Sequence, residues 1–197
     1  DYVTYREYQR RLQASKMRTA LVQAAQMSWS TPMKDPRTRF VKRDEAGFSN
    51  ELSESQKQAA QLEPQIEQLY QLLLLGEADR SAEKSQRWQA GYDLALGRVL
   101  ATKVRTETYN AMLAVAKRGI KLKDPKSNTF TLVPADIVSV GSQYKKGAEK
   151  AKELLQRVID QHEGTPWAYL ANKELATPIG WEWKESYTDL SPPPRPG

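Results

Sequence analysis

Residues 148–175 read AEKAKELLQRVIDQHEGTPWAYLANKEL, which contains an amphipathic helix, a stop and a second helix. Apolar residues recur every three or four positions in the first arm, as on the buried face of a helix: Ala148, Ala151, Leu154, Leu155, Val158 and Ile159. The second arm continues this spacing from Trp167 to Leu175. The stretch therefore predicts helices near residues 142–162 and 166–176.

The residues between the two arms carry turn signals: Gly164, Thr165 and Pro166. Glycine adopts the left-handed conformation that closes a helix. Threonine caps a following helix, and proline fits the first helical position, where no amide donor is needed. Because the connection is so short, the two helices are expected to pack antiparallel, with these three residues as the structural turn.

Periodic apolar patterns elsewhere predict four more helices, near residues 2–29, 53–75, 81–101 and 105–118. Ser53 is the expected cap of its helix, and Pro64 is expected to kink or split that helix. Residues 81–117 keep the helical period throughout, and the polar stretch 102–108 is the expected break. Gly91 and Gly97 weaken this helix, so we expect a neighbouring helix to approach the backbone there.

The remaining segments lack helical spacing. Residues 32–50 are predicted to form a loop, and residues 129–133 are β-prone and expected to form an extended segment or a hairpin with 137–140. Residues 178–183 contain two tryptophans and are expected to pack on the last helix. Residues 191–197 are expected to be a disordered proline-rich tail. These patterns predict one all-α domain over residues 1–190, a tetratricopeptide-like or irregular array of antiparallel helical hairpins with one small extended or β-hairpin insertion.

Composition excludes some classes of site and leaves the compartment open. The 197 residues contain no cysteine, which excludes disulfides, thiolate metal sites and cysteine nucleophiles. No apolar run, Leu72–Leu75 included, approaches the ~20 residues of a membrane-spanning helix. The chain starts at Asp1 without an initiator methionine or a signal peptide, so we expect a fragment or a processed protein, and its localisation is not predicted.

The net charge of +6 is unevenly distributed. Residues 1–43 hold ten basic and three acidic side chains, whereas residues 44–79 hold one basic and eight acidic. We expect the basic first helix, with Arg10, Arg11, Lys16 and Arg18, to lie near the acidic one. The alternative is that this helix binds nucleic acid or another anionic surface.

Residues 151–171 are similar to a tetratricopeptide-type hairpin, with alanines and leucines at its small and large positions and the turn His162-x-Gly164-Thr165-Pro166. No second unit of ~34 residues repeats the signature.

A longer resemblance rests on Arg87–Arg98 (RWQAGYDLALGR), Glu107–Asn110 (ETYN), Gly164–Ala168 (GTPWA) and Thr177–Trp181 (TPIGW). With these stretches the chain resembles a planctomycete family in which a von Willebrand factor type A domain precedes a helical C-terminal region. The resemblance implies that the chain is this helical region. That family's type A domain implies a metal site with an Asp-x-Ser-x-Ser motif, which this sequence lacks, so no metal chemistry is carried over.

Candidate chemical sites are few. His162 is the single histidine, and a role in the turn is favoured over catalysis because no second histidine or cysteine accompanies it. The carboxylate pair Asp44 and Glu45 is read as solvated charge. Residues 141–147 mimic a glycine-rich loop but lack the Gly-Lys-Ser/Thr of a phosphate loop. We therefore expect no catalytic, metal or cofactor site and no enzyme activity.

Aromatic and arginine residues are the candidate partner-binding set: Trp88, Tyr92, Arg98, Arg105, Trp167, Tyr169, Trp181 and Trp183. Core packing is the favoured role for the aromatics, and a partner-binding groove is the alternative. The sequence favours a non-catalytic interaction or scaffold module that binds a protein partner. The alternatives are a nucleic-acid or anionic-surface binder and, ranked last, an enzyme that uses carboxylates alone. No specific nucleic acid is expected as a partner.

Overall fold

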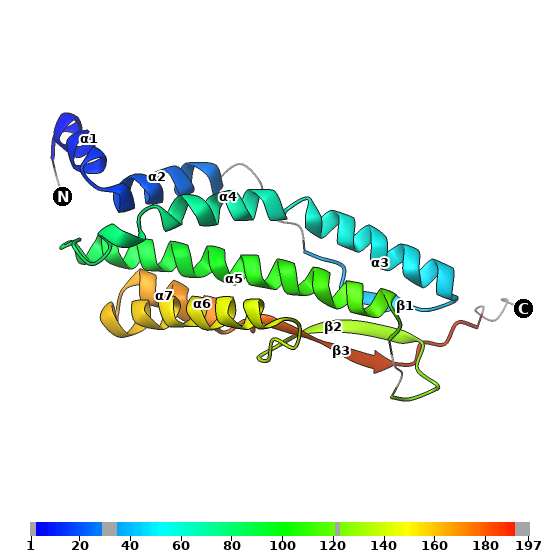
Figure 1. The fold of residues 1–197 in the computed structure, drawn as a ribbon. Helices are drawn as coiled ribbons and strands as arrows, with labels where there is room; N and C mark the ends of the chain where they lie inside the picture. Colours follow the sequence, from blue (N-terminus) through cyan, green and yellow to red (C-terminus); the bar gives the residue numbers. More distant parts are fainter. Residues whose placement is uncertain (1–2, 29–34, 121–122, 192–197) are drawn as a thin grey trace, which may run out of the picture.

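A single long helix, α5 (Gln86–Lys117), runs along most of the molecule and packs against elements on several sides (Figure 1). The computed structural model describes residues 3–28, 35–120 and 123–191. The other elements, in chain order, are α1 (Tyr5–Gln13), α2 (Lys16–Ser28), β1 (Arg39–Val41), α3 (Glu45–Ala60), α4 (Glu63–Leu74), the 3₁₀ turn η1 (Glu77–Asp79), β2 (Thr129–Ala135), α6 (Ser142–Gln161), α7 (Pro166–Leu175) and β3 (Gly180–Ser186). The chain is thus mostly helical, with a small antiparallel sheet.

The predicted break between residues 102 and 108 is wrong, because α5 continues through it as one helix. The threonine hydroxyls there bond back to the helix itself. Thr106 donates to the carbonyl of Thr102 at 3.0 Å, and Thr108 donates to that of Val104 at 2.6 Å. These bonds leave the main-chain ladder intact. Contacts then support both halves, since α2, α4 and α6 pack on the first half and α3 and β3 on the second.

The acidic segment forms two helices, as Pro64 predicts, but it begins earlier than expected. Asp44, not Ser53, is the N-cap of α3 and accepts a hydrogen bond from the amide of Gly47 at 2.7 Å. Pro64 lies in the first turn of α4, where its missing amide costs nothing. The predicted loop 32–50 is therefore wrong in its second half, which contains β1 and the start of α3.

The first predicted helix is also divided. α1 ends at Gln13, and α2 restarts at Lys16, with Ser15 accepting a hydrogen bond from the amide of Arg18. α1 projects beyond the rest of the helices, while α2 lies along α4 (Figure 1). The end expected near residue 29 lies outside the described residues.

The hairpin near the C-terminus is confirmed. Gly164 has φ of +73°, the conformation that favours glycine. The hydroxyl of Thr165 accepts a bond from the amide of Ala168 at 3.3 Å, and Pro166 is the first residue of α7. The buried face of α6 contains Ala148, Ala151, Leu154, Leu155 and Val158, which the apolar spacing had picked out.

Residues 129–135 are extended, as one of the two alternatives predicted, but the hairpin with 137–140 is wrong, since this strand pairs with two distant segments instead. β2 is the central strand of a three-stranded antiparallel sheet of order β1-β2-β3. β1 places Phe40 opposite Phe130, and β3 places Trp183 opposite Leu132. The tryptophan-containing segment 178–183 therefore leads into a strand, β3. The predicted all-α fold is corrected to a mostly helical fold with a three-stranded sheet.

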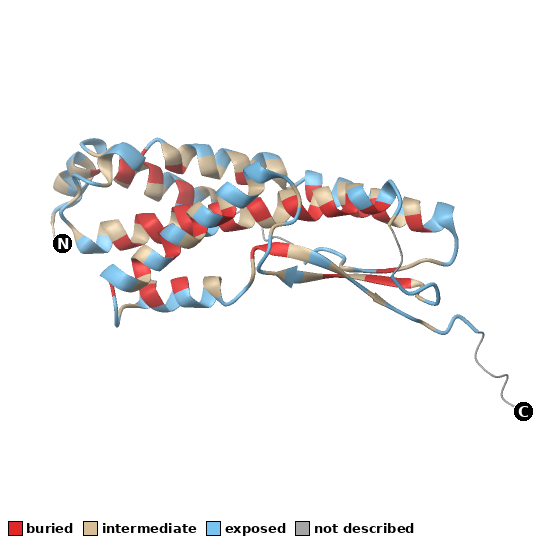
Figure 2. Ribbon diagram, turned by 60° about the horizontal axis from the view of Figure 1, so that its bottom comes forward, coloured by how far each residue is buried: buried red, intermediate tan, exposed pale blue. Residues whose placement is uncertain are grey.

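Buried residues line the faces that the helices turn toward one another (Figure 2). One core lies between α2, α4, α5 and α6, with Tyr92, Leu96 and Leu154 fully buried. A second core lies between α3, α5 and the sheet, around Phe40 and Phe130. The helices cover one face of the sheet, so the molecule has a helical end and a helix-on-sheet end.

Close backbone approach is confirmed at Gly97. A Cβ on Gly97 would lie 2.9 Å from Cγ of Leu155 on α6. Gly147 on α6 is placed reciprocally, since a Cβ there would lie 2.8 Å from a methyl of Val104. At Gly91 the nearest atom is a methyl of Leu21 at 3.4 Å, an ordinary contact. The α5–α6 packing thus depends on two glycines.

Among the described residues, no helix combines the length and the apolar character needed to cross a membrane. The proline-rich tail predicted at 191–197 lies outside the described residues beyond Ser191.

Candidate functional site

The candidate residues at the sheet belong to the core. Trp183 makes edge-to-face contacts with Phe40 and Phe130, at ring-centroid distances of 5.8 and 6.4 Å. Trp181 packs on Tyr109 at 5.7 Å and donates its indole N–H to the carbonyl of Arg105 at 2.9 Å. Trp181 joins the sheet to α5, and Trp183 packs on the aromatic side chains of the sheet itself, so both partly buried tryptophans have a core-packing role.

Tyr92 and Arg105 also hold the fold together. Tyr92 is fully buried and donates its hydroxyl to the carbonyl of Leu73 at 2.5 Å. Burial raises the pKa of this phenol far above its ordinary value. Arg105 pairs with Glu174 and donates to the carbonyls of Thr177 and Pro178, which secures the end of α7. These side chains are engaged within the molecule.

Trp88 and Trp167, far apart in the sequence, line one cavity of about 420 Å³. Trp88 comes from the first turn of α5 and Trp167 from the first turn of α7. The opposite wall comes from α1 and α2, including Tyr8 and Leu21. The other wall and floor residues are Val3, Arg11, Leu12, Arg18, Ser85, Arg87 and Gly91. Tyr169 points away from the core and is 69% exposed.

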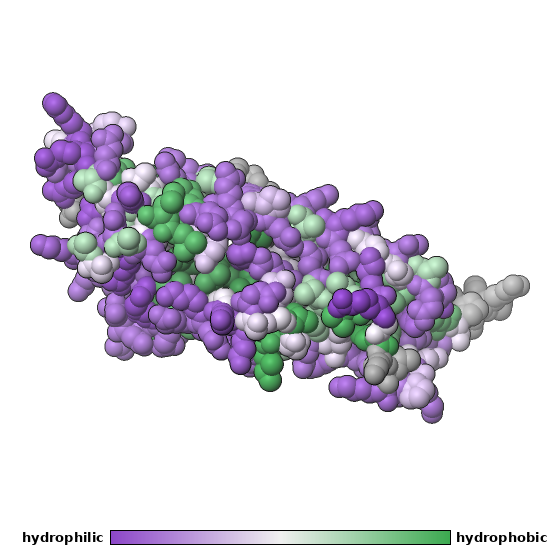
Figure 3. All heavy atoms as spheres, in the orientation of Figure 1, coloured by the Kyte–Doolittle hydropathy of each residue, from purple (hydrophilic) through white to green (hydrophobic). Residues whose placement is uncertain are grey.

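A second cavity of about 490 Å³ adjoins the first, because Leu21 lines both. It lies between α2, α4 and α5, and its lining is largely apolar: Leu21, Ala24, Ala25, Leu62, Gln65, Ile66, Leu69, Leu73, Ala95, Arg98, Val99 and Thr102. The face of the molecule seen in Figure 3 is mostly hydrophilic, with apolar atoms gathered in a few places. We call the two cavities together the α5 groove.

The α5 groove follows one stripe of α5. Trp88, Gly91, Ala95, Val99 and Thr102 are three or four residues apart, so they share one helical face. The stripe covers about 21 Å along the helix axis, at ~1.5 Å per residue. The groove is therefore long enough to lie along about four turns of another helix.

Charge is concentrated at the Trp88 end of the α5 groove. Arg18 stacks over Trp88, with its guanidinium carbon 5.1 Å from the ring centroid, and pairs with Glu83 at 2.6 Å. The hydrogen bond from Arg18 is the main reason the pKa of Glu83 lies below its ordinary value. Arg87 lies beside them, exposed, without an ion pair among the described residues. This end of the groove can attract an acidic group.

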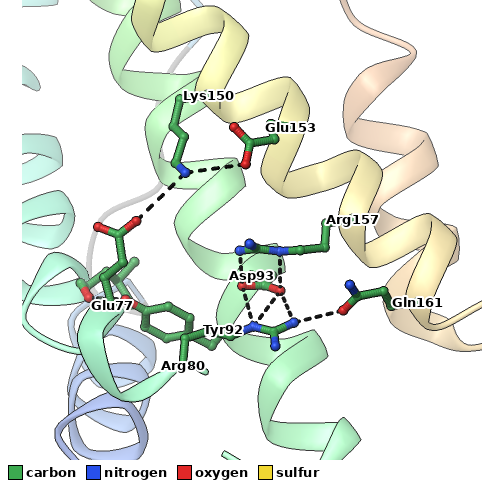
Figure 4. A network of polar contacts seen from close by, with 9 residues as sticks. Glu77, Arg80, Tyr92, Asp93, Lys150, Glu153, Arg157 and Gln161 are labelled. Carbon is green, nitrogen blue, oxygen red and sulfur yellow. Dashed lines mark hydrogen bonds and ion pairs between the residues drawn. The ribbon is translucent and has the colours of Figure 1, made fainter. Parts of the chain in front are cut away.

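Asp93, the most buried carboxylate among the described residues, was not predicted as a site residue. Its side chain is fully buried and accepts hydrogen bonds from Arg80 and Arg157 at 2.7–3.3 Å (Figure 4). Arg80 also donates to Gln161 at 3.0 Å. Because the two guanidiniums already occupy both oxygens, this carboxylate acts as a link between η1, α5 and α6. The available signal was an acidic residue inside the buried run Ala90–Leu96.

His162 has the structural position expected for it. It is the C-cap of α6 and its carbonyl accepts the hydroxyl of Thr165 at 2.5 Å. Burial lowers the pKa of its imidazole, and the positive charge of Arg80 adds to the effect while Asp93 opposes it. No group of three or more potential metal ligands occurs in the described part of the chain.

The basic first helices carry acidic partners. Arg10 and Arg11 both bond to Glu7 within α1, Arg18 bonds to Glu83, and the amide of Lys16 bonds to Asp79. The hydrogen bonds from Arg10 and Arg11 lower the pKa of the Glu7 carboxyl to about 2. α2 lies beside α4 of the acidic segment, as expected, but the described ion pairs of Arg10, Arg11 and Arg18 are with Glu7 and Glu83, which lie outside residues 44–79.

Comparison with protein-family models, curated proteins and solved structures gives no match for this chain.

Proposed function

We propose that this chain is a non-catalytic interaction module that binds an amphipathic helical segment of a partner protein in the α5 groove. The observation that carries the proposal is the pair of adjoining cavities along the Trp88–Thr102 stripe. Grooves of this kind bind helices through apolar side chains three or four residues apart. Aromatic and arginine side chains, which gather at one end, are the residue types that dominate binding energy at interfaces.

The charges define the chemistry of the proposed partner. The partner's helix carries a row of apolar side chains that contacts Ala95, Val99 and Leu69. It also carries an acidic residue at the end that lies against Arg87. Apolar burial supplies most of the binding free energy, at about 25 cal/mol per Å² removed from water. The acidic residue sets the direction in which the helix lies, since reversing the helix would leave Arg87 without its partner.

The α6–α7 hairpin supports a finer proposal about architecture. Its turn, Gly164–Pro166, ends α6 and begins α7 within a few residues, and α7 contributes Trp167 to the groove wall. We propose that this hairpin is a repeat-like unit within the helical region of a larger von Willebrand factor type A domain protein. The resemblance of residues 87–98 and 164–168 to that family supports this assignment.

The test is a selection of 14–16-residue helical peptides against the whole chain, followed by affinity measurements on variants. Ala95→Gln fills the middle of the groove without removing any core atom, and it should weaken binding at least tenfold. Arg87→Glu should weaken peptides with an acidic end and spare those without one. Tyr169→Ala, an exposed aromatic on α7, is the matched control and should bind normally. If the selected peptides bind the Ala95→Gln variant as tightly as they bind the unmodified chain, the proposal is contradicted.

A further inference from the structure

β3 forms one edge of the sheet, and the direction of its backbone groups follows from the register. The amide of Leu132 donates to the carbonyl of Thr38 at 2.8 Å, so Leu132 faces β1. Because successive residues of a strand face opposite sides, Thr131 and Val133 face β3. Their partners on β3 are Lys184 and Glu182, which therefore direct their backbone N–H and C=O toward β2.

The alternate residues of β3 direct their backbone groups away from the sheet. These are Trp181, Trp183 and Glu185. Among the described residues, no hydrogen bond beyond the β2–β3 ladder involves their main-chain amides or carbonyls. β3 forms the lower margin of the sheet end in Figure 1. Such an edge is a template for another strand.

The exposed side chains of β3 alternate in charge. Glu182 and Lys184 lie two residues apart on the same face and approach to 3.6 Å, with 55% and 65% of their side chains exposed. This face is opposite the one on which Trp181 and Trp183 pack into the core. The edge therefore presents a negative and a positive charge on either side of Trp183.

This pattern is complementary to itself. If β3 pairs antiparallel with β3 of a second copy, centred on Trp183, then Glu182 lies opposite the second copy's Lys184, and Lys184 opposite the second copy's Glu182. The same register places Trp183 opposite its own counterpart and Trp181 opposite the second copy's Glu185. These are the residues whose backbone groups point outward, so hydrogen bonding and charge select one register.

We propose that two copies of this chain associate through β3 and form a continuous six-stranded antiparallel sheet about a two-fold axis. This interface is separate from the α5 groove and does not depend on its function. Opposite charges directly across such a pair stabilise it, whereas like charges destabilise it. A seven-residue edge is small beside the roughly 1,200 Å² of stable interfaces, so the dimer is expected to be weak and concentration-dependent.

Cysteine cross-linking tests the register, because the chain has no cysteine of its own. Glu182→Cys and Lys184→Cys variants are mixed and treated with a mild oxidant. In the proposed pair these positions are opposite and not hydrogen-bonded, with Cα atoms about 4.5 Å apart, within the span of a disulfide. The mixture should therefore cross-link faster than either variant alone. In a dimer of one variant, such as Glu182→Cys, the two cysteines lie two residues away from being opposite each other. A mixture of Lys145→Cys and Glu149→Cys variants, both exposed on α6, is the control. It measures the rate at which cysteines cross-link through random collision.

Charge reversal tests the same register without a covalent bond. Sedimentation of the unmodified chain from ~5 to ~500 µM should show reversible dimer formation. Glu182→Lys and Lys184→Glu alone should each dimerise at least several-fold more weakly, because each places like charges opposite one another. A mixture of these two variants should form heterodimers, since every pair is then again opposite in charge. A chain that stays monomeric throughout, or cross-linking no faster in the Glu182→Cys and Lys184→Cys mixture than in the α6 control, would overturn the proposal.

Discussion

Arg157 of α6 donates two hydrogen bonds, at 2.7 and 2.9 Å, to the fully buried carboxylate of Asp93 on α5. Arg80 donates to the same carboxylate from the segment after η1, so three elements meet at one acidic group (Figure 4). The helical end of the molecule is thus connected through a charge that lies out of water. Such a charge depends on all of its partners.

We predict that Asp93→Asn destabilises the chain strongly. The amide cannot accept bonds from two guanidiniums on both of its terminal atoms, so buried positive charge loses its partner. Breaking a buried pair in this way typically costs about 3–5 kcal/mol. Urea denaturation measures the change in unfolding free energy. Arg98→Met, which removes a half-exposed pair with Glu174, is the control and should cost about 0–1 kcal/mol. Equal costs for the two variants would refute the structural role of Asp93.

Gly97→Ala should destabilise the α5–α6 packing. The added Cβ would lie 2.9 Å from Cγ and 3.1 Å from a methyl of Leu155, inside contact distance. Overpacking of a core typically costs about 1–3 kcal/mol, more than the helix propensity that alanine adds. Gly91→Ala on the same helix is the matched control, since its Cβ has room. Thermal melting should fall for Gly97→Ala and hold or rise for Gly91→Ala, and the reverse order would contradict the packing described.

Gly164→Val should weaken the α6–α7 hairpin through the backbone rather than through contacts. No atom lies within 4 Å of a Cβ at this position, so space is available. The φ of +73° is nevertheless strongly unfavourable for a β-branched residue and costs on the order of 1–3 kcal/mol. Gly164→Asn, which tolerates this conformation better, should lose less stability. Equal melting temperatures for glycine, asparagine and valine at this position would show that the turn can relax.

His162 should make stability depend on pH just below neutrality. Burial lowers its pKa in the folded chain, so below about pH 6.5 the unfolded chain takes up a proton that the folded chain does not. The contribution of His162 to the free energy of unfolding should therefore be constant above pH 6.5 and should decrease as the pH falls below 6.5. His162 is the single histidine, so His162→Gln should remove this slope. A slope that persists in His162→Gln would assign it to another group. Glu83, whose pKa is lowered, contributes in a separate window below about pH 4.5.

Local patterns predicted the elements that local interactions control. The turn at Gly164–Pro166 and both of its helices follow from cap residues and apolar spacing, and the structure has them at the expected positions. Pro64 likewise divides its segment because proline acts on its own backbone. The close approach at Gly97 was also predictable, since a glycine inside a helix needs a packing reason.

The features that the sequence did not predict involve groups whose partners are distant in the sequence. The polar stretch 102–108 remains helical because other elements support both halves of α5 and its threonines bond back to the helix. β1 and β3 lie 90 and 51 residues from β2, counted from strand start to strand start, and so had no local signal. Asp93 was overlooked because its arginines come from residues 80 and 157.

The sequence by itself determined which segments are mostly helical and the amphipathic hairpin with its turn at Gly164–Pro166, because these depend on interactions between residues a few positions apart. Tertiary structure decided which aromatics are core and which line a groove. Trp181 and Trp183 are partly buried because β3 brings them against the core between α3, α5 and the sheet, whereas Trp88 and Trp167 meet at a cavity because α5 and α7 begin side by side. Burial is a property of the assembled surfaces, and a side chain's own chemistry does not specify which other side chains will cover it.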